Sequence, residues 1–111
     1  MDEITVRLIA RTWSAIDATI DNVISTAAVA GEADAVRTGE EIRESGWAQV
    51  PWVDGQWPPL DQQIAISLSR AHWEFALERM REHAEIYARL GDATSLELSR
   101  AAIEVMTAAL P

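Results

Sequence analysis

The chain has 111 residues and a formal net charge of -9, and it contains no Cys. Its length fits a single domain over residues 1–111. The missing Cys excludes disulfides, thiol nucleophiles and thiolate metal sites. The excess of carboxylates argues against electrostatic binding to nucleic acid or to an anionic membrane. We expect a cytoplasmic protein that binds neither.

An apolar seam runs through the first thirty residues. Its members recur at alternating spacings of three and four: Val6, Ile9, Trp13, Ile16, Ile20, Val23, Ala27 and Ala30. This spacing is typical of one long helix, which we predict over residues 2–30, with Gly31 as its stop. Thr38 to Glu41 fit a capping box and predict a short helix over about 39–45, which Gly46 would end.

Residues 46–59 have an unusual composition and read GWAQVPWVDGQWPP. Their prolines forbid a continuous helix, so we predict a connecting loop. Asp54-Gly55 is a strong signal for a two-residue turn. If the chain turns there, the flanking residues face each other in pairs, Val53 with Gln56 and Trp52 with Trp57.

A second long helix is predicted over residues 61–90. One of its stripes consists of Ile66, Trp73, Leu77, Met80, Ala84 and Tyr87, and a nearly opposite stripe of Ile64, Leu68, Ala71 and Phe75. The first half of this helix would be apolar on two faces, and both faces need a cover. We therefore expect a homodimer formed through the two long helices, with a monomeric bundle as the alternative. Trp13 and Trp73 should be buried in the core.

The last helix is predicted over residues 95–110, because Thr94 to Glu97 form a second capping box. We find no internal repeat. The predicted fold class is therefore all-α. It is a small bundle of two long antiparallel helices, a short helix and a C-terminal helix, with a Trp- and Pro-rich connecting loop.

Three carboxylates are the best candidates for a metal site. On a helix, Glu40 and Glu44 lie one turn apart with Glu41 close by, and such a group can share a divalent cation. The spacing resembles the one with which all-α NTP pyrophosphohydrolases hold Mg²⁺. The second half of their pattern is poorly matched, since its nearest candidate, Glu82–Glu85, ends in Glu in place of Asp. A solvated helix face is the favoured interpretation, and a small Mg²⁺-dependent hydrolase is the alternative.

No other residues predict a catalytic site. His72 and His83 lie about 16 Å apart along one helix, too far to share a metal, and we expect both to pack at the edge of the apolar stripes. No nucleophile, base and orienting group occur together. We expect no catalytic residues and no cofactor.

The loop Trp residues carry the functional prediction. Trp side chains are enriched at binding hot spots, so Trp52 and Trp57 are predicted to anchor a protein partner of unknown identity. Trp47 is also a candidate, although we expect it to be tucked inward. In the competing interpretation all three form a lid over the core. The sequence thus predicts a non-catalytic interaction module: an adaptor, an inhibitor or immunity-type protein, or a small subunit of a complex.

Overall fold

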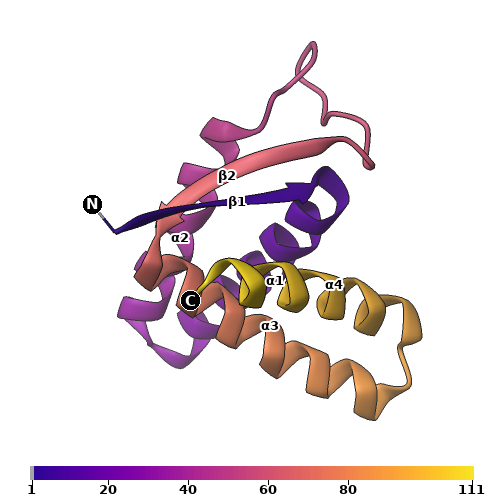
Figure 1. Ribbon diagram of the computed structural model, residues 1–111. Coiled ribbons are helices and arrows are strands. Elements are labelled where there is room, and N and C mark those ends of the chain that lie inside the picture. The colour runs from indigo at the N-terminus through magenta and orange to yellow at the C-terminus, as the bar shows by residue number, and fades with distance from the viewer. Residues whose placement is uncertain (1) are drawn as a thin grey trace.

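The computed structural model describes residues 2–111 as a mostly helical fold with a two-stranded antiparallel sheet (Figure 1). The elements follow one another in the order β1 (Glu3–Ile9), α1 (Ala10–Ala30), α2 (Ala33–Gln49), β2 (Gln63–Ser69), α3 (Arg70–Leu90) and α4 (Ala93–Ala109). The two strands lie side by side, and the segment between α2 and β2 projects from the body of the molecule. The predicted fold class is therefore correct in its helical content and wrong in excluding strands.

The chain consists of two similar halves, each with the order strand, long helix, shorter helix. In both halves the three elements have 7, 21 and 17 residues. Every element of the second half begins 60 residues after its counterpart. Identical residues occupy four key counterpart positions: Ile4 and Ile64, Leu8 and Leu68, Trp13 and Trp73, and Gly31 and Gly91. The prediction of no internal repeat is therefore wrong. The repeat was hidden because few other positions are identical.

The sheet register relates the two halves by an approximate twofold axis. Val6 pairs with Ile66, its own counterpart, at the middle of the sheet, and Glu3 pairs with Ser69 at one end. Alternate side chains of both strands face inward, as expected for a sheet with one covered face. The two strands therefore form one ribbon whose inner face belongs to the core of both halves.

The core is centred on two tryptophans, one from each half. Trp13 and Trp73 are both fully buried, and their rings meet edge to face with centroids 6.2 Å apart. Their predicted burial is confirmed. Aromatic pairs in this geometry stabilise the folded state by more than the burial of their area alone would give. This pair therefore links α1 to α3 at the centre of the molecule.

The predicted helix over residues 2–30 is wrong at its beginning, where residues 3–9 form β1. The inward side chains of this strand are Ile4, Val6 and Leu8, which alternate with exposed positions. Val6 and Ile9 happen to extend the helical spacing of the seam backward from Trp13. The alternation with a period of two was the correct signal.

The second long helix was also predicted to begin too early, since residues 63–69 form β2 and α3 begins at Arg70. Ile64, Ile66 and Leu68 were divided between two helix faces, but all three point inward from one strand. The apolar surface that suggested a homodimer is therefore covered within a single chain. The homodimer remains a prediction, but this apolar surface no longer supports it.

The shorter helices are longer than predicted. A single helix, α2, runs through Gly39 and Gly46, because both glycines are buried where the neighbouring α1 comes close. A Cβ atom at Gly46 would overlap the ring of Trp13. In α4 the capping residue is Asp92, whose side chain accepts a hydrogen bond from the amide of Ser95, so the predicted cap at Thr94 and start at Ser95 are also wrong.

Candidate functional site

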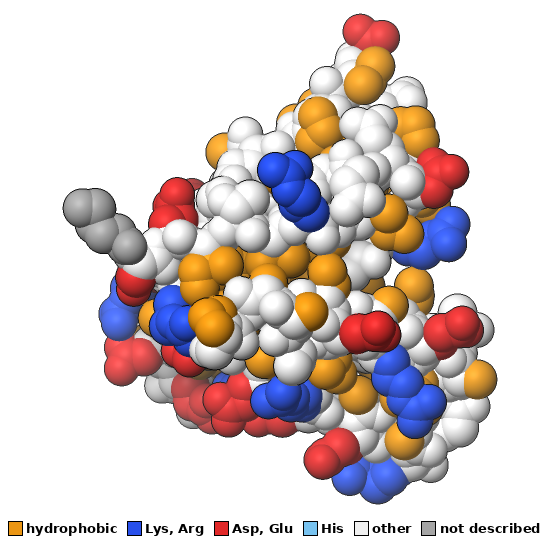
Figure 2. All heavy atoms as spheres, viewed as in Figure 1, with side chains coloured by type: hydrophobic (Ala, Val, Ile, Leu, Met, Phe, Trp, Pro, Cys, Tyr) orange, Lys and Arg blue, Asp and Glu red, His pale blue; other side chains and the backbone are white. Residues whose placement is uncertain are grey.

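The segment between α2 and β2 makes the predicted turn. Val53 and Gln56 exchange two backbone hydrogen bonds of 3.0 Å, and Asp54 and Gly55 both adopt positive φ angles, 51° and 75°. Positive φ at both central residues is the mark of the tight turn that Asp-Gly favours. Figure 2 shows the projecting segment, with apolar side chains along it and an acidic group at its end.

The three Trp residues of this region form a continuous row. The ring centroids of Trp47 and Trp52 are 5.2 Å apart, and those of Trp52 and Trp57 are 5.1 Å apart, with neighbouring rings tilted by about 50°. Two indole N–H groups are fixed: that of Trp47 donates to Asp17 Oδ1 at 2.9 Å, and that of Trp52 to the carbonyl of Trp47 at 2.8 Å. We call these three residues the Trp row, and the two indole bonds fix the rings of Trp47 and Trp52 within it.

The exposure of the Trp row reverses one expectation. Trp47 is 44% exposed, whereas Trp52 and Trp57 are half-buried and pack against the core. The prediction that Trp47 is tucked inward is wrong, because α2 continues past Gly46 and places Trp47 on its outer face. Two members of the row therefore pack against the core, as the lid interpretation expects, and Trp47 is the most exposed of the three.

A buried carboxylate holds Trp47 in place. Asp17 of α1 is 7% exposed and accepts hydrogen bonds from Arg43 Nε at 3.0 Å and from Arg43 Nη2 at 3.2 Å, besides the Trp47 indole. Arg43 also pairs with Asp21 at 2.9 Å. The hydrogen bond to Asp17 raises the pKa of Arg43 above its usual value. Sequence reasoning missed this network, because Asp17 and Arg43 lie on different helices and no spacing links them.

An open hollow of about 540 Å³ lies beside the exposed ring, lined by Arg43, Glu44 and Trp47. The guanidinium of Arg43 lies 5.7 Å from the centroid of the Trp47 ring. One wall is thus aromatic, and charged groups form the rest. This hollow joins the candidate residue Trp47 to one of the three candidate metal ligands, Glu44.

The candidate metal ligands spread along the outer side of α2. Glu41 meets His72 of α3 at 3.3 Å, while Glu40 and Glu44 line an open hollow with Arg37 and Arg43. Over residues 2–111, no group of three or more His, Asp or Glu side chains is placed to hold a metal ion. The metal site at Glu40, Glu41 and Glu44 therefore remains a prediction, as part of the alternative function of a small Mg²⁺-dependent hydrolase.

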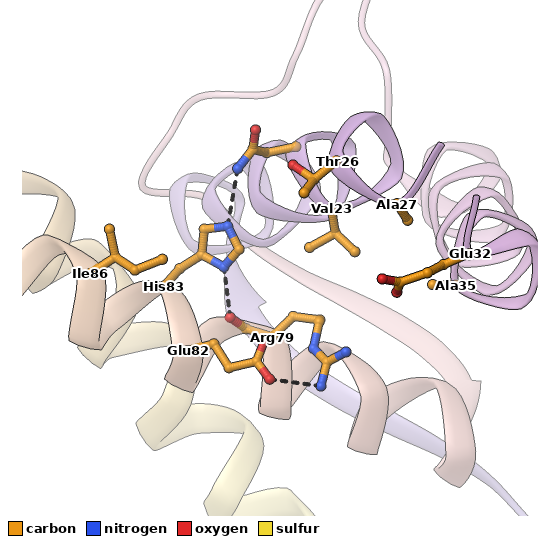
Figure 3. Close-up of a pocket in the computed structure, with 10 residues that line it drawn as sticks. Val23, Thr26, Ala27, Glu32, Ala35, Arg79, Glu82, His83 and Ile86 are labelled. Atoms are coloured by element: carbon orange, nitrogen blue, oxygen red, sulfur yellow. Dashed lines mark hydrogen bonds and ion pairs between the residues drawn. The ribbon is translucent and has the colours of Figure 1, made fainter. Parts of the chain in front are cut away.

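A cleft between α1 and α3 contains His83 (Figure 3). The ring nitrogen Nδ1 lies 2.9 Å from the carbonyl of Arg79, and Nε2 lies 3.1 Å from the side-chain nitrogen of Asn22. A carbonyl only accepts, so Nδ1 carries the proton and Nε2 accepts from Asn22. Both nitrogens of His83 are thus engaged within the protein, in agreement with a packing role.

The outer face of the ribbon is a second exposed polar surface. Thr5 and Arg7 of β1 and Gln63 and Ala65 of β2 are all exposed there, and Thr5 bonds to Ser67 across the strands at 2.6 Å. A two-stranded ribbon of this kind fits the width of the DNA major groove.

Comparison of the chain with protein-family models, with curated proteins and with solved structures finds no match. Over residues 2–111, none of the helices has the length and apolar character needed to cross a bilayer.

Proposed function

We propose that the protein is a non-catalytic, cytoplasmic interaction module that binds a protein partner through the Trp row, with Trp47 as the anchor. The observation that carries the proposal is the exposed ring of Trp47 at the end of a row whose other members are fixed against the core. The candidate classes are an adaptor, an inhibitor or immunity-type protein, and a small subunit of a complex.

The energetics of association favour an anchor of this kind. Ordering side chains on binding costs free energy, so groups that are already fixed bind more tightly. The indole bond to Asp17 and the contact with Trp52 fix Trp47 in advance. An exposed Trp offers a large apolar area that a pocket of the partner can cover. A few such residues supply most of the binding free energy at typical interfaces.

The test compares the wild-type protein with Trp47→Ala as affinity baits in an extract of the source cells. A genuine partner should be captured by the wild type and lost by Trp47→Ala, because truncating a hot-spot Trp costs about 2 kcal/mol or more of binding free energy. Val29→Ala is the matched control, since Val29 is 92% exposed and lies outside the row.

The other two members of the row separate binding from support. Trp52→Ala and Trp57→Ala should lower the melting temperature as well as partner capture, because both rings pack against the core. Trp47→Ala removes one of the three hydrogen bonds that Asp17 accepts, so it should also lower the melting temperature somewhat, and capture is compared at a temperature where both proteins are folded. If Trp47→Ala captures every protein that the wild type captures, the row is structural and the proposal fails.

The exposed face of the ribbon favours a second candidate function, sequence reading in a DNA groove. Arg7, Thr5 and Gln63 carry groups that can bond to base edges. The net charge of -9 weighs against it, since phosphate neutralisation supplies most non-specific affinity. Selection from a random duplex library decides: enriched sequences that Arg7→Ala no longer binds would support this candidate, and no enrichment would end it.

Two further predictions belong with this proposal. A thermal shift on adding Mg²⁺ or Mn²⁺ tests the hydrolase alternative, because saturation a hundredfold above the dissociation constant stabilises by about 2.7 kcal/mol. Glu40→Gln should abolish such a shift.

Light scattering at micromolar concentration tests the homodimer, and a mass near 12.3 kDa at all concentrations would contradict it.

A further inference from the structure

The surface beside Trp47 continues along α2 into a second hollow. The two hollows share Arg43 and Glu44, and the second, of about 510 Å³, is also lined by Asp21, Ile24, Arg37, Glu40 and Glu41. A partner segment seated on the Trp47 ring therefore has an open path along this side of the helix. The residues of that path limit the chemistry of the segment.

Both arginines on this path already pair with carboxylates of this chain. Arg43 lies between Asp17 and Asp21, and Arg37 pairs with Asp34 at 2.9 Å. Among the described residues, Glu40 and Glu44 have no cationic side chain within 4 Å. Within the described residues, the surface next to Trp47 therefore presents two carboxylates without a cationic partner and no unpaired arginine.

The spacing of these groups gives the path a direction. Glu40, Glu44 and Trp47 follow one another at intervals of four and three residues, so they form one stripe on the helix. The stripe is about 10 Å long at 1.5 Å per residue. An extended peptide spans that length with about three residues.

We propose that the occupant of this surface is a basic segment of a protein partner. One apolar side chain of the segment covers Trp47. A Lys or Arg within about four residues of that side chain lies beside Glu40 and Glu44. The inference rests on the proposed binding function of the Trp row. A second copy of this chain is a poor occupant, because its own charge of -9 would meet carboxylates. Charge complementarity of this kind selects partners and speeds their encounter.

The experiment is a selection of phage-displayed random dodecapeptides on the immobilised full-length protein. Enriched peptides should combine an aromatic or large aliphatic residue with Lys or Arg on one side, and Trp47→Ala should no longer bind them. The best peptide, made synthetically, is then titrated against the wild type and against Glu40→Gln and Glu44→Gln. Each substitution should weaken binding about two- to fivefold, the range for an exposed ion pair, and the loss should shrink at high salt.

The repeat provides a matched control. Glu104 is the counterpart of Glu44 at the same position of α4, and it is also exposed. Glu104→Gln should therefore leave the affinity unchanged. Peptides that need Trp47 but carry no cations would overturn this inference and leave the proposed function standing. If no enriched peptide depends on Trp47, both fail.

Discussion

Helices α2 and α4 occupy equivalent places in the two halves. Comparing them distinguishes the properties that the fold requires from those that differ between the halves. Their 17 positions alternate between buried, half-buried and exposed in the same order from beginning to end. The buried positions hold different side chains: Gly39, Ile42 and Gly46 in α2 correspond to Ser99, Ala102 and Met106 in α4. The shared pattern of burial, rather than shared residues, therefore defines the repeat.

The two halves differ at the site around Trp47. The network of Asp17, Arg43 and Trp47 in the first half corresponds to Leu77, Ile103 and Thr107 in the second. No equivalent of the buried ion pair or of the exposed indole exists at those positions. A feature that the fold needs should recur in both halves, so a feature found in one half alone is the better candidate for function.

The largest expected effect tests the part that the halves share. Trp13→Ala and Trp73→Ala should each lower the free energy of unfolding by about 3–5 kcal/mol, because each removes a fully buried ring from the same core. Denaturant melts measure both losses. A loss below about 1 kcal/mol for either residue would show that the two halves do not contribute equally to this core.

The next effect tests a site where the halves differ. Gly46→Ala should destabilise by about 1–3 kcal/mol or more, because the new methyl group would overlap the ring of the fully buried Trp13. Gly39→Ala should cost less. There the Cβ would meet Cγ1 of Ile24 at 2.6 Å, and that half-buried side chain has room to move. Equal losses in thermal melts would contradict this reading of α2.

A smaller effect distinguishes the two core tryptophans. The indole N–H of Trp73 donates to the carbonyl of Ile4 at 2.8 Å, whereas the buried N–H of Trp13 finds no acceptor within residues 2–111. Trp73→Phe should therefore cost about 1 kcal/mol more than Trp13→Phe, because only the first breaks a hydrogen bond. Urea unfolding of the two variants side by side gives the difference, and a larger loss for Trp13→Phe would refute it.

The smallest effect depends on pH and concerns the helix caps. Hydrogen bonds from Ser95 lower the pKa of Asp92, so the ionised carboxylate stabilises the folded state. This contribution is present above the pKa of the unfolded chain and is lost as the pH falls through the lower folded value. Asp92→Ala should lower the melting temperature at neutral pH and make progressively less difference in acid.

The equivalent cap in the first half supplies the control. Glu32 precedes α2 and makes no capping hydrogen bond through its side chain. Glu32→Ala should therefore change the melting temperature less than Asp92→Ala at neutral pH. Equal shifts for both variants at all pH values would remove the cap as the cause.

Much of the helical structure could be predicted from the sequence, because helix spacing, Gly31 and Gly91 mark the real elements. The strands are easily merged with the helices that follow them, since Val6 and Ile9 continue the helical spacing of Trp13. The alternation of Ile64, Ile66 and Leu68 did carry the strand signal. A comparison of the sequence with itself at an offset of 60 would have shown the same alternation twice.

The candidate site was only partly predictable. The Asp-Gly turn and the facing of Trp52 and Trp57 follow from local turn chemistry, and the structure confirms both. The exposure of Trp47 depends on how far α2 extends, which its two glycines obscured. The bond from Trp47 to Asp17 joins residues 30 positions apart, and such a contact requires the tertiary fold.

The segment over residues 50–62 makes the pairing of β1 with β2 an intramolecular event. Because the two halves belong to one chain, dilution does not separate them. The entropy cost of closing such a connection grows only slowly with its length. In a symmetric assembly of identical chains, every substitution appears on both sides of the axis. A covalent link removes that constraint, and a surface can change on one half while its counterpart keeps its original chemistry.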